Sequence, residues 1–380
     1  MIAFVSSNDQ WGGSEELWSL AALALARRGH RLAVFKSRLD RAHPRIRALL
    51  ALGCTVADLR GPRLMPGKLL SLAGLFWPVA RRMIQVRLWF ALRAPRPELV
   101  VISQGLNYDG WLAARACRRL NLPYVMLSQK ADDLYWPTDS MRAELRELYR
   151  GARVALFVSE HNLQLTEEQI GCRLPNARVV RNPFEVAWEL RDDWPDETDG
   201  LNLACLARLD AREKGQDLLL RVMAMPKWRS RPIRVSFFGA GHNANGLKEM
   251  AALLGLENVR FAGFTATPDA VWDDHHGLIL PSRCEGLPLS QVEAMLSGRV
   301  AIVTDVGGTA EVLIDGETGF LAAAPTVAEI DVALERAWSR RGEWRAIGRA
   351  AAVHVRTLTT PDPAGDFADR LLDLACAGPA

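Results

Sequence analysis

Short apolar runs alternate with amphipathic stretches along the whole chain. In the first half, runs that are hydrophobic at nearly every position, as expected of strands buried on both faces of a parallel sheet, occupy residues 2–6, 31–37, 98–103, 124–128 and 154–159. Residues 14–29 lie between the first two runs, carry apolar side chains at helical spacing and end at Gly29. This order of strand, glycine turn, helix and strand predicts a βαβ unit.

A second series of the same kind follows a polar, turn-prone stretch at residues 191–200. Its strands are expected at residues 201–207, 233–239, 259–263, 276–281 and 300–305, and its helices at residues 215–225, 245–254, 288–297 and 326–337. The alternation predicts an α/β fold with two doubly wound, Rossmann-like domains, residues 1–183 and 184–360, that face each other across a ligand-binding cleft. We expect a hinge near residues 183–200. The amphipathic tail at about residues 361–380 should form one more helix that packs back on the first domain.

Length and composition agree with a two-domain globular protein. The 380 residues are 49% hydrophobic and 24% charged, which argues against extended disorder. The six cysteines lie far apart and form no CxxC pair, which excludes a zinc ribbon and a disulfide scaffold and fits a reducing compartment. No apolar stretch reaches the roughly 18 residues that a membrane-spanning helix needs, and the start of the chain lacks the basic flank of a signal peptide. We therefore expect a cytoplasmic protein.

Charge is divided unevenly between the two halves. The net charge of +3 combines +11 for residues 1–185, with 27 basic and 16 acidic side chains, and −8 for the remainder, with 20 basic and 28 acidic ones. Two interpretations follow: either the domains attract each other, or the first half meets an anionic partner. Nucleic acid is not expected as that partner, because no segment resembles a module that stacks bases or reads a groove.

Residues 67–96 fit an anionic membrane surface as the partner. Basic side chains surround an apolar, aromatic stretch there, as in segments that lie in a membrane interface. The residues concerned are Lys68, Arg81, Arg82, Arg87, Arg93 and Arg96, together with Phe76, Trp77, Trp89 and Phe90. The alternative interpretation is a pair of core helices with charged outer faces.

The strongest chemical signal lies in residues 281–299, directly after an expected strand. Pro288 suits the first position of a helix, which leaves Glu285 in the preceding loop. Gly286 allows a ligand close to the backbone, and unpaired N–H groups at a helix start attract phosphate. Glu293 follows Glu285 by eight positions, so both carboxylates could accept hydrogen bonds from hydroxyl groups in one small cavity. A sugar nucleotide offers phosphate and hydroxyl groups together; a capped helix with solvated acids is the alternative.

Two other turns follow expected strands. In residues 206–220, Arg208 and Lys214 could neutralise a diphosphate, although solvated basic residues on a loop would look the same. The glycine turn at residues 10–16 lacks the third glycine of a dinucleotide-binding motif, and its two adjacent glutamates are expected to repel an anion. A tight turn that admits a substrate near its backbone is the remaining interpretation.

In their order along the chain, these segments resemble the retaining GT-B glycosyltransferases, specifically glycosyltransferase family 4. The matching elements are the early GG-x-E turn with its helix and RRGH, RNPF (181–184), LARLD…EKG (206–215), FxGF (261–264), the E-x7-E motif (285–293) and GGxxEVxxDGxTGFL (307–321). Six elements in one order are far more specific than any of them alone. The resemblance implies transfer of a sugar from a UDP- or GDP-linked donor, with retained anomeric configuration and without a metal or another cofactor.

The resemblance also implies roles for individual residues. Arg208 and Lys214 would hold the donor diphosphate, and Glu293 would hold the ribose hydroxyls. Glu285 would contact the donor sugar beside the amides of the next two residues, and Gly13 would line the cleft. Donor contacts are thus implied for Gly13, Arg208, Lys214, Gly263, Glu285, Gly286, Leu287 and Glu293, and catalytic roles for Glu285, Arg208, Lys214 and Gln129.

One position departs from the family pattern. Many members carry a histidine after the strand expected at residues 124–128, where this chain has Gln129. An amide can hydrogen-bond a sugar hydroxyl but cannot act as a base. Any histidine-assisted step is therefore in doubt, whereas transfer is feasible if the leaving phosphate accepts the proton of the acceptor.

The leading hypothesis is a glycosyltransferase of the hexosyltransferase type that builds a cell-surface polysaccharide, lipopolysaccharide or glycolipid. Related enzymes often use lipid-linked acceptors, so we expect a glycan or lipid-linked acceptor and a peripheral position on the inner face of the cytoplasmic membrane. Two alternatives stay open. One is a sugar phosphorylase or epimerase of the same fold, and the other is a catalytically silent protein that binds a sugar nucleotide.

Overall fold

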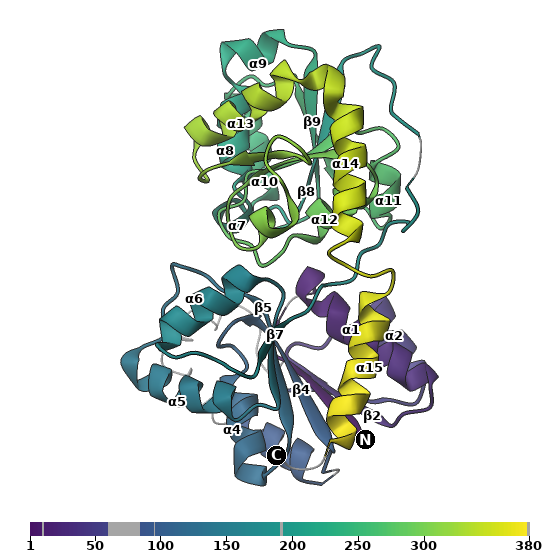
Figure 1. Cartoon of the computed structure of the whole chain (residues 1–380), viewed down its shortest axis with the longest axis vertical. Helices are drawn as coiled ribbons and strands as arrows, with labels where there is room; N and C mark the ends of the chain where they lie inside the picture. Colours follow the sequence, from purple (N-terminus) through teal and green to yellow (C-terminus); the bar gives the residue numbers. More distant parts are fainter. Residues whose placement is uncertain (10, 60–83, 95, 191–192, 378–380) are drawn as a thin grey trace. The chain divides into compact units, whose positions relative to one another are not determined.

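The computed structural model describes residues 1–9, 11–59, 84–94, 96–190 and 193–377. The chain forms two compact units: unit 1 comprises Met1–Pro183 and the segment that starts at Asp362, and unit 2 comprises Phe184–Pro361. Each unit is built on a parallel sheet with helices packed against it (Figure 1). The predicted α/β fold with two Rossmann-like domains is confirmed.

Unit 1 contains a seven-stranded sheet in the order β3-β2-β1-β4-β5-β6-β7. Its strands are β1 (Ile2–Ser6), β2 (Leu32–Lys36), β3 (Thr55–Asp58), β4 (Leu99–Leu106), β5 (Tyr124–Lys130), β6 (Val154–Phe157) and β7 (Ala177–Val179). All five runs predicted as strands are strands. The sequence pattern missed β3 and β7, which are the two edges of the sheet and have few fully buried positions.

Helices cover both faces of this sheet. Successive side chains along a strand point to opposite faces, so each central strand contributes to two cores. On one face, Ile2 and Phe4 of β1 belong to a core with α1 and α15, so the last helix of the chain packs against the first one. On the other face, Ala3 and Val5 belong to a core with α4 and α5. The described part of unit 1 includes the helices α1 (Glu16–Arg27), α2 (Pro44–Ala51), α4 (Trp111–Leu120), α5 (Asp139–Arg150), α6 (Glu160–Ile170) and α15 (Pro363–Cys376), besides the helical residues 84–93.

Unit 2 contains a six-stranded sheet in the order β10-β9-β8-β11-β12-β13. Its strands are β8 (Leu201–Leu206), β9 (Ile233–Phe238), β10 (Val259–Gly263), β11 (Gly277–Leu280), β12 (Val300–Thr304) and β13 (Phe320–Ala322). Its helices are α7 (Ala211–Lys214), α8 (Gln216–Met223), α9 (Pro226–Ser230), α10 (Ala244–Leu253), α11 (Pro268–Val271), α12 (Leu289–Leu296), α13 (Val327–Ser339) and α14 (Trp344–Arg356). The predicted strands and helices of this half are present, whereas β13, α7, α9, α11 and α14 are additional.

Two local predictions need correction. Helix α12 begins at Leu289, and Pro288 is its N-cap, with an extended ψ of 124°, rather than its first helical residue. Lys214 is the last residue of the short helix α7 and not part of an open loop. The reason is local: Asp210 caps α7 by accepting a hydrogen bond from the backbone N–H of Glu213.

The basic aromatic segment at residues 67–96 lies partly outside the described residues, as do its Lys68, Phe76, Trp77, Arg81 and Arg82. Residues 84–93 are helical. Leu88 and Leu92 are buried in the core of unit 1, so this stretch is an amphipathic helix with one core face. Along the described part of the chain, no helix is both long enough and apolar enough to cross a bilayer.

Candidate active site

The expected diphosphate-binding residues lie on a short turn after β8 in unit 2. Three side chains hold this turn in place. The Asp210 carboxylate accepts from the Glu213 N–H at 3.4 Å, the Asn243 side-chain oxygen accepts from the Ala211 N–H at 3.1 Å, and the Gln216 amide donates to the Arg208 carbonyl at 2.7 Å. The backbone on both sides of α7 is therefore fixed before any ligand binds.

Gly215 explains why glycine follows lysine in this turn. Its φ is +64°, and a Cβ there would lie 1.9 Å from the Pro281 carbonyl oxygen. The turn can therefore pack directly on the loop between β11 and α12 only if this residue has no side chain. The Glu213 carbonyl joins the same two segments, because it accepts hydrogen bonds from the N–H groups of Arg283 at 2.7 Å and Cys284 at 3.2 Å.

An ion pair reinforces this connection. Arg283 donates to both carboxylate oxygens of Asp217 at 2.7 and 2.8 Å. Burial opposes ionisation of Asp217, but the Arg283 guanidinium outweighs it and holds the pKa of this carboxyl below its ordinary value. The two loops that carry the candidate residues thus behave as one piece.

A second glycine supports the loop from its other side. Gly307 has a φ of +59°, and a Cβ there would lie 2.2 Å from the Glu285 carbonyl oxygen. Gly308 donates its N–H to the Gly286 carbonyl at 2.6 Å. The GG motif at 307–308 and the EG pair at 285–286 are therefore packed backbone against backbone.

Two further glycines allow close packing of the backbone next to Arg208. A Cβ at Gly239 would lie 2.1 Å from the Ala207 carbonyl oxygen, and a Cβ at Gly241 would lie 2.3 Å from the Leu209 carbonyl oxygen. The Gly263 carbonyl accepts a hydrogen bond from Gly239 at 2.8 Å. Gly263 itself ends β10 with a φ of +80°. Gly263 is thus connected to the Arg208 turn through its hydrogen bond with Gly239.

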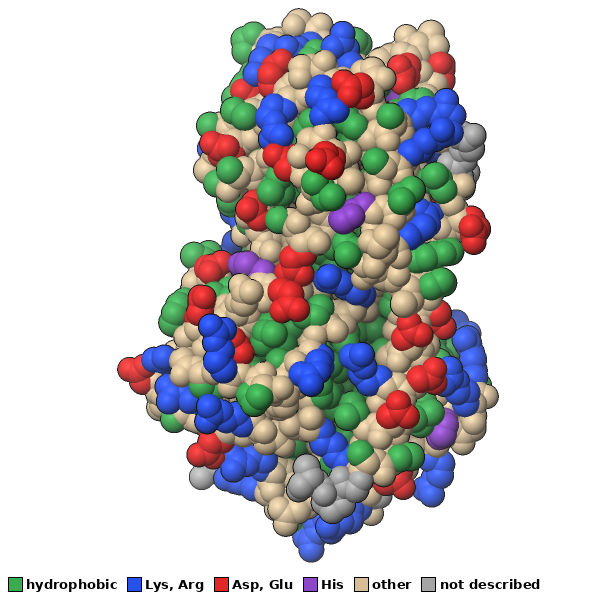
Figure 2. Space-filling model, viewed as in Figure 1, with side chains coloured by type: hydrophobic (Ala, Val, Ile, Leu, Met, Phe, Trp, Pro, Cys, Tyr) green, Lys and Arg blue, Asp and Glu red, His purple; other side chains and the backbone are tan. Residues whose placement is uncertain are grey.

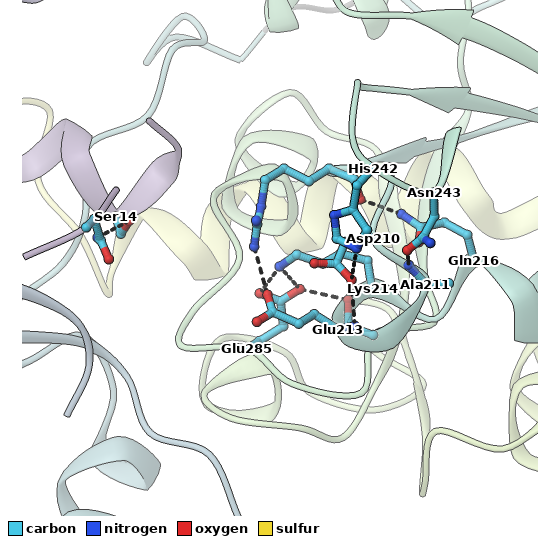
Figure 3. A network of polar contacts seen from close by, with 12 residues as sticks. Ser14, Asp210, Ala211, Glu213, Lys214, Gln216, His242, Asn243 and Glu285 are labelled. Atoms are coloured by element: carbon cyan, nitrogen blue, oxygen red, sulfur yellow. Dashed lines mark hydrogen bonds and ion pairs between the residues drawn. The ribbon is translucent and has the colours of Figure 1, made fainter. Parts of the chain in front are cut away.

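Lys214 and Glu285 meet at the centre of this arrangement (Figure 3). The Lys214 ammonium donates to both carboxylate oxygens of Glu285 at 2.7 Å. Ser282 donates its hydroxyl to the same carboxylate at 2.7 Å. The structure therefore brings Lys214 and Glu285, two of the residues singled out from the sequence, into direct contact.

The second cation also has a carboxylate partner. Arg208 pairs with Glu213 at 2.7 Å, and both side chains reach solvent. Glu213 was not predicted from the sequence, although it stands next to Lys214 in the EKG motif. Ser282, three positions before Glu285, was missed in the same way. Identifying such partners requires the fold, because a charge on a loop does not reveal which neighbour it faces.

Glu293 lies inside α12 and has different surroundings. It is buried, and its Oε1 accepts a hydrogen bond from the Glu185 backbone N–H at 3.0 Å. Gly286 and Leu287 precede α12 and are buried as well. The two glutamates of the E-x7-E motif thus have separate partners, Lys214 with Ser282 for Glu285 and a backbone amide for Glu293.

A thiol beneath this site is not a nucleophile. Cys205 lies on β8 and is fully buried, and burial raises its pKa to about 12. The thiol therefore stays protonated at neutral pH.

In unit 1, Gly13 is exposed at the start of the short 3-10 helix Gly13–Glu15. The adjacent Glu15 is fully buried and pairs with Lys36 at 2.7 Å. Glu15 also accepts hydrogen bonds from Ser6 and from Asn8, both at 2.8 Å. The next residue, Glu16, pairs with Arg45 on α2 at 3.0 Å. The expectation that these glutamates would repel an anion is corrected, because each has its own counter-ion.

Gln129 lies at the end of β5 and is buried. Its side-chain oxygen accepts a hydrogen bond from Asn182 at 2.8 Å. Among the described residues, the Gln129 amide nitrogen and the Asn182 side-chain oxygen have no partner. Exchanging the O and N assignments of both amides would again leave one donor and one acceptor. The pair thus leaves one donor and one acceptor, the complement of a hydroxyl group, and both atoms are buried in the structure.

Two family models match this chain, one over most of each of the two units. Residues 12–184 match the model of the glycosyl transferase 4-like domain, and residues 200–340 match the model of glycosyl transferases group 1. The chain belongs to the GT-B glycosyltransferases. Its 4-like domain contains Gly13 and Gln129, and its group 1 domain contains all the other candidate residues.

Two of the relatives that resemble this chain in sequence illustrate the match. A GDP-mannose-dependent alpha-(1-6)-phosphatidylinositol monomannoside mannosyltransferase of Mycolicibacterium smegmatis is 28% identical over 254 residues, 61% of this chain and 61% of that protein. A glycogen synthase of Pseudomonas syringae pv. syringae is 32% identical over 166 residues, 43% of this chain and 32% of that protein. The match therefore covers less than two thirds of either relative.

Solved structures share the fold over nearly the whole chain. Anabaena HepE in complex with UDP and glucose has a TM-score of 0.75 and 19% identity, over 98% of this chain and 99% of that one. The lipopolysaccharide outer core galactosyltransferase WaaB has a TM-score of 0.68 and 18% identity, over 98% and 99%. At such identities the likeness shows the GT-B fold of this glycosyltransferase chain.

Proposed function

We propose that this protein is a retaining glycosyltransferase that moves a sugar from a UDP- or GDP-linked donor to a glycan or lipid-linked acceptor. The observation that carries the proposal is the contact of Lys214 with Glu285 on two glycine-packed loops, with Arg208 on the same turn. A cation for phosphate and a carboxylate for hydroxyl groups are what a sugar nucleotide needs from one site. One relative is named as a GDP-mannose-dependent mannosyltransferase, and HepE has been solved in complex with UDP and glucose.

Donor binding would rearrange these contacts. Lys214 and Arg208 would turn to the diphosphate, and the amides of Gly286 and Leu287 would add hydrogen bonds at the start of α12. Glu285, still held by Ser282, would then accept hydrogen bonds from the donor sugar, and Glu293 would accept them from the ribose. In this proposal the cations and the amides stabilise the leaving diphosphate, so that transfer needs no metal.

Transfer with retained configuration requires the following bond changes. The bond between the anomeric carbon and the phosphate oxygen breaks, and the acceptor oxygen forms a bond to the same face of that carbon. The proton of the acceptor hydroxyl passes to the leaving phosphate oxygen, because the Gln129 amide cannot take it. Gln129 and Asn182 would bind a hydroxyl group of the sugar.

An acceptor at an anionic membrane surface is part of the proposal. It is supported by the +11 charge of residues 1–185 and by the helical residues 84–93, whose Phe90 side chain is 62% exposed. Lys and Arg side chains also gather over α4 and α5 on the face shown in Figure 2. Several basic residues together can hold a protein reversibly at such a surface.

A second candidate is a protein that binds a sugar nucleotide without turning it over, and Gln129 in place of histidine favours it. Thermal unfolding with a panel of UDP- and GDP-sugars distinguishes the two when nucleotide release is measured on the same samples. A donor at 100 times its Kd stabilises the folded state by about 2.7 kcal/mol. Stabilisation with release supports transfer, stabilisation without release on any acceptor supports the silent binder, and no stabilisation contradicts both.

A further inference from the structure

Both cations of the candidate site have carboxylate partners before any ligand binds. Arg208 and Lys214 are matched by Glu213 and Glu285, and a third carboxylate, Asp210, caps α7. A nucleoside diphosphate brings at least two more negative charges. A diphosphate that binds Arg208 and Lys214 therefore has to compete with the carboxylates that these two side chains contact in the described structure.

The two carboxylates differ in how readily they give up their cations. Glu285 is buried and keeps a hydrogen bond from Ser282 when Lys214 turns away. Glu213 is partly solvated, with 27% of its side chain exposed against 44% for Arg208. Its carboxylate can therefore turn to water when a phosphate replaces it at Arg208.

The side chain of Glu213 can be changed without loosening the turn. Its backbone N–H donates to Asp210, and its carbonyl accepts from Arg283 and Cys284. The carbonyl hydrogen bonds connect the two segments of the site, and the N–H bond caps α7; none of them depends on the carboxylate. In Figure 3 the side chain of Glu213 lies beside Lys214 and Glu285, within the same group of charges.

We infer that Glu213 competes with the donor diphosphate for Arg208 and thereby limits the affinity for the nucleotide and speeds its release. The inference rests on the proposed function, because it assigns the diphosphate to Arg208. Glu213 acts through Arg208 and is a positioning residue. An exposed ion pair contributes up to about 1 kcal/mol, so removal of the competing charge should tighten nucleotide binding by up to about fivefold.

The test is calorimetric titration of the full-length protein with UDP and with GDP. Glu213→Gln should bind the preferred nucleotide about two- to fivefold more tightly, with slower release in stopped-flow measurements and with kcat and KM both lowered. Glu213→Asp keeps the charge and should stay near the wild type. Glu343→Gln is the matched control, since Glu343 forms a comparable exposed pair with Arg340 in the same unit, and it should change nothing.

A double-mutant cycle assigns the effect to Arg208. In an Arg208→Ala background, Glu213→Gln should no longer tighten binding, because the competition has been removed. A Glu213→Gln variant that is folded and binds as the wild type or more weakly overturns the inference while the proposed function stands. If the wild type binds neither UDP nor GDP, the proposed function fails and the inference fails with it.

Discussion

At the scale of single residues, the candidate site is a set of charges that have partners within the protein. Lys214 holds Glu285 with both oxygens at 2.7 Å, and Glu293 accepts a backbone N–H at 3.0 Å. These contacts satisfy the charged side chains in the absence of a ligand, and a donor diphosphate would exchange the contacts of the cations for its own. Ser282 and the Glu185 N–H keep the two carboxylates in place during that exchange.

Lys214→Ala and Glu293→Ala should each weaken the binding of UDP or GDP. Each change removes a charged hydrogen bond, which contributes about 1.5–3 kcal/mol, so the Kd should rise roughly 10- to 150-fold. Lys227→Ala is the control, because Lys227 pairs with Asp331 and Glu335 elsewhere in unit 2. Unchanged affinity in both site variants would contradict the assignment of these residues to the donor.

Residue roles could be predicted from the sequence only in part. The spacing of Glu285 and Glu293, and the place of Arg208 and Lys214 after a strand, were visible in the pattern. The pairing of Glu213 with Arg208 was not, because it depends on how one turn of α7 presents its side chains. The partner of Gln129 lies 53 positions away, at Asn182, and only the packed fold brings the two amides together.

At the scale of elements, glycines determine how closely the loops of unit 2 approach. Gly215 and Gly307 have positive φ values and stand against carbonyl oxygens of the β11–α12 loop. Backbone packing of this kind leaves no room for a methyl group. Backbone packing therefore requires glycine at these positions, whether or not a ligand binds.

Gly215→Ala should destabilise unit 2 and weaken nucleotide binding. Its left-handed conformation and the 1.9 Å approach to the Pro281 carbonyl together predict a loss of about 2–5 kcal/mol in the free energy of unfolding. Gly246→Ala is the matched control: a Cβ there meets nothing within 4 Å, and alanine favours the helix α10. Denaturant unfolding measures both, and equal stability of the two variants would show that the approach of the loops is not as close as described.

In unit 1, the buried pair of Glu15 and Lys36 makes a separate prediction about stability. The Lys36 side chain is 3% exposed and that of Glu15 is 0% exposed, so Lys36→Met leaves an uncompensated buried carboxylate at a cost of about 3–5 kcal/mol. The double change Glu15→Leu/Lys36→Met should recover most of this loss. Arg118→Met, which removes an exposed pair with Glu147, should cost less than about 1 kcal/mol. A double variant no more stable than Lys36→Met in urea unfolding would contradict this.

Elements were predictable where burial is complete and less so at the edges. The central strands of both sheets are apolar at nearly every position, which identifies them without further information. Three of the four edge strands, β3, β7 and β13, have only three or four residues and include exposed or half-buried positions. The fourth edge strand, β10, is also largely exposed, but it has five residues and was predicted. The pairing of the three short strands depends on the neighbouring strand and not on a pattern of their own.

At the scale of the whole molecule, charge separates the two halves of the sequence, with +11 for residues 1–185 and −8 for the rest. Long-range attraction toward an anionic surface depends on such a distribution, whereas the fold does not. The asymmetry could be read from the sequence alone. Which side chains carry it at the surface could not, because burial is decided by packing.

Reversal of charge on the helical residues 84–93 tests the proposed membrane surface. Each basic residue near an anionic surface contributes about 1 kcal/mol, so Arg87→Glu/Arg93→Glu should lower binding to anionic vesicles roughly tenfold or more. Arg340→Glu/Arg341→Glu in unit 2 is the control with the same change in net charge. Binding should also fall at 1 M salt, where the Debye length is about 3 Å. Equal co-sedimentation with neutral and anionic vesicles would exclude this surface as a membrane contact.

Turnover of a nucleotide sugar tests the central proposal most directly. The wild type is incubated with each UDP- and GDP-sugar in EDTA, with a glycan or lipid-linked acceptor, and product configuration is followed by NMR. The proposal predicts that one donor is consumed, that UDP or GDP is released, that the anomeric configuration is retained, and that Arg208→Ala/Lys214→Ala is inactive. Consumption of no donor, inversion of configuration, or activity that requires added Mg²⁺ or Mn²⁺ would contradict it.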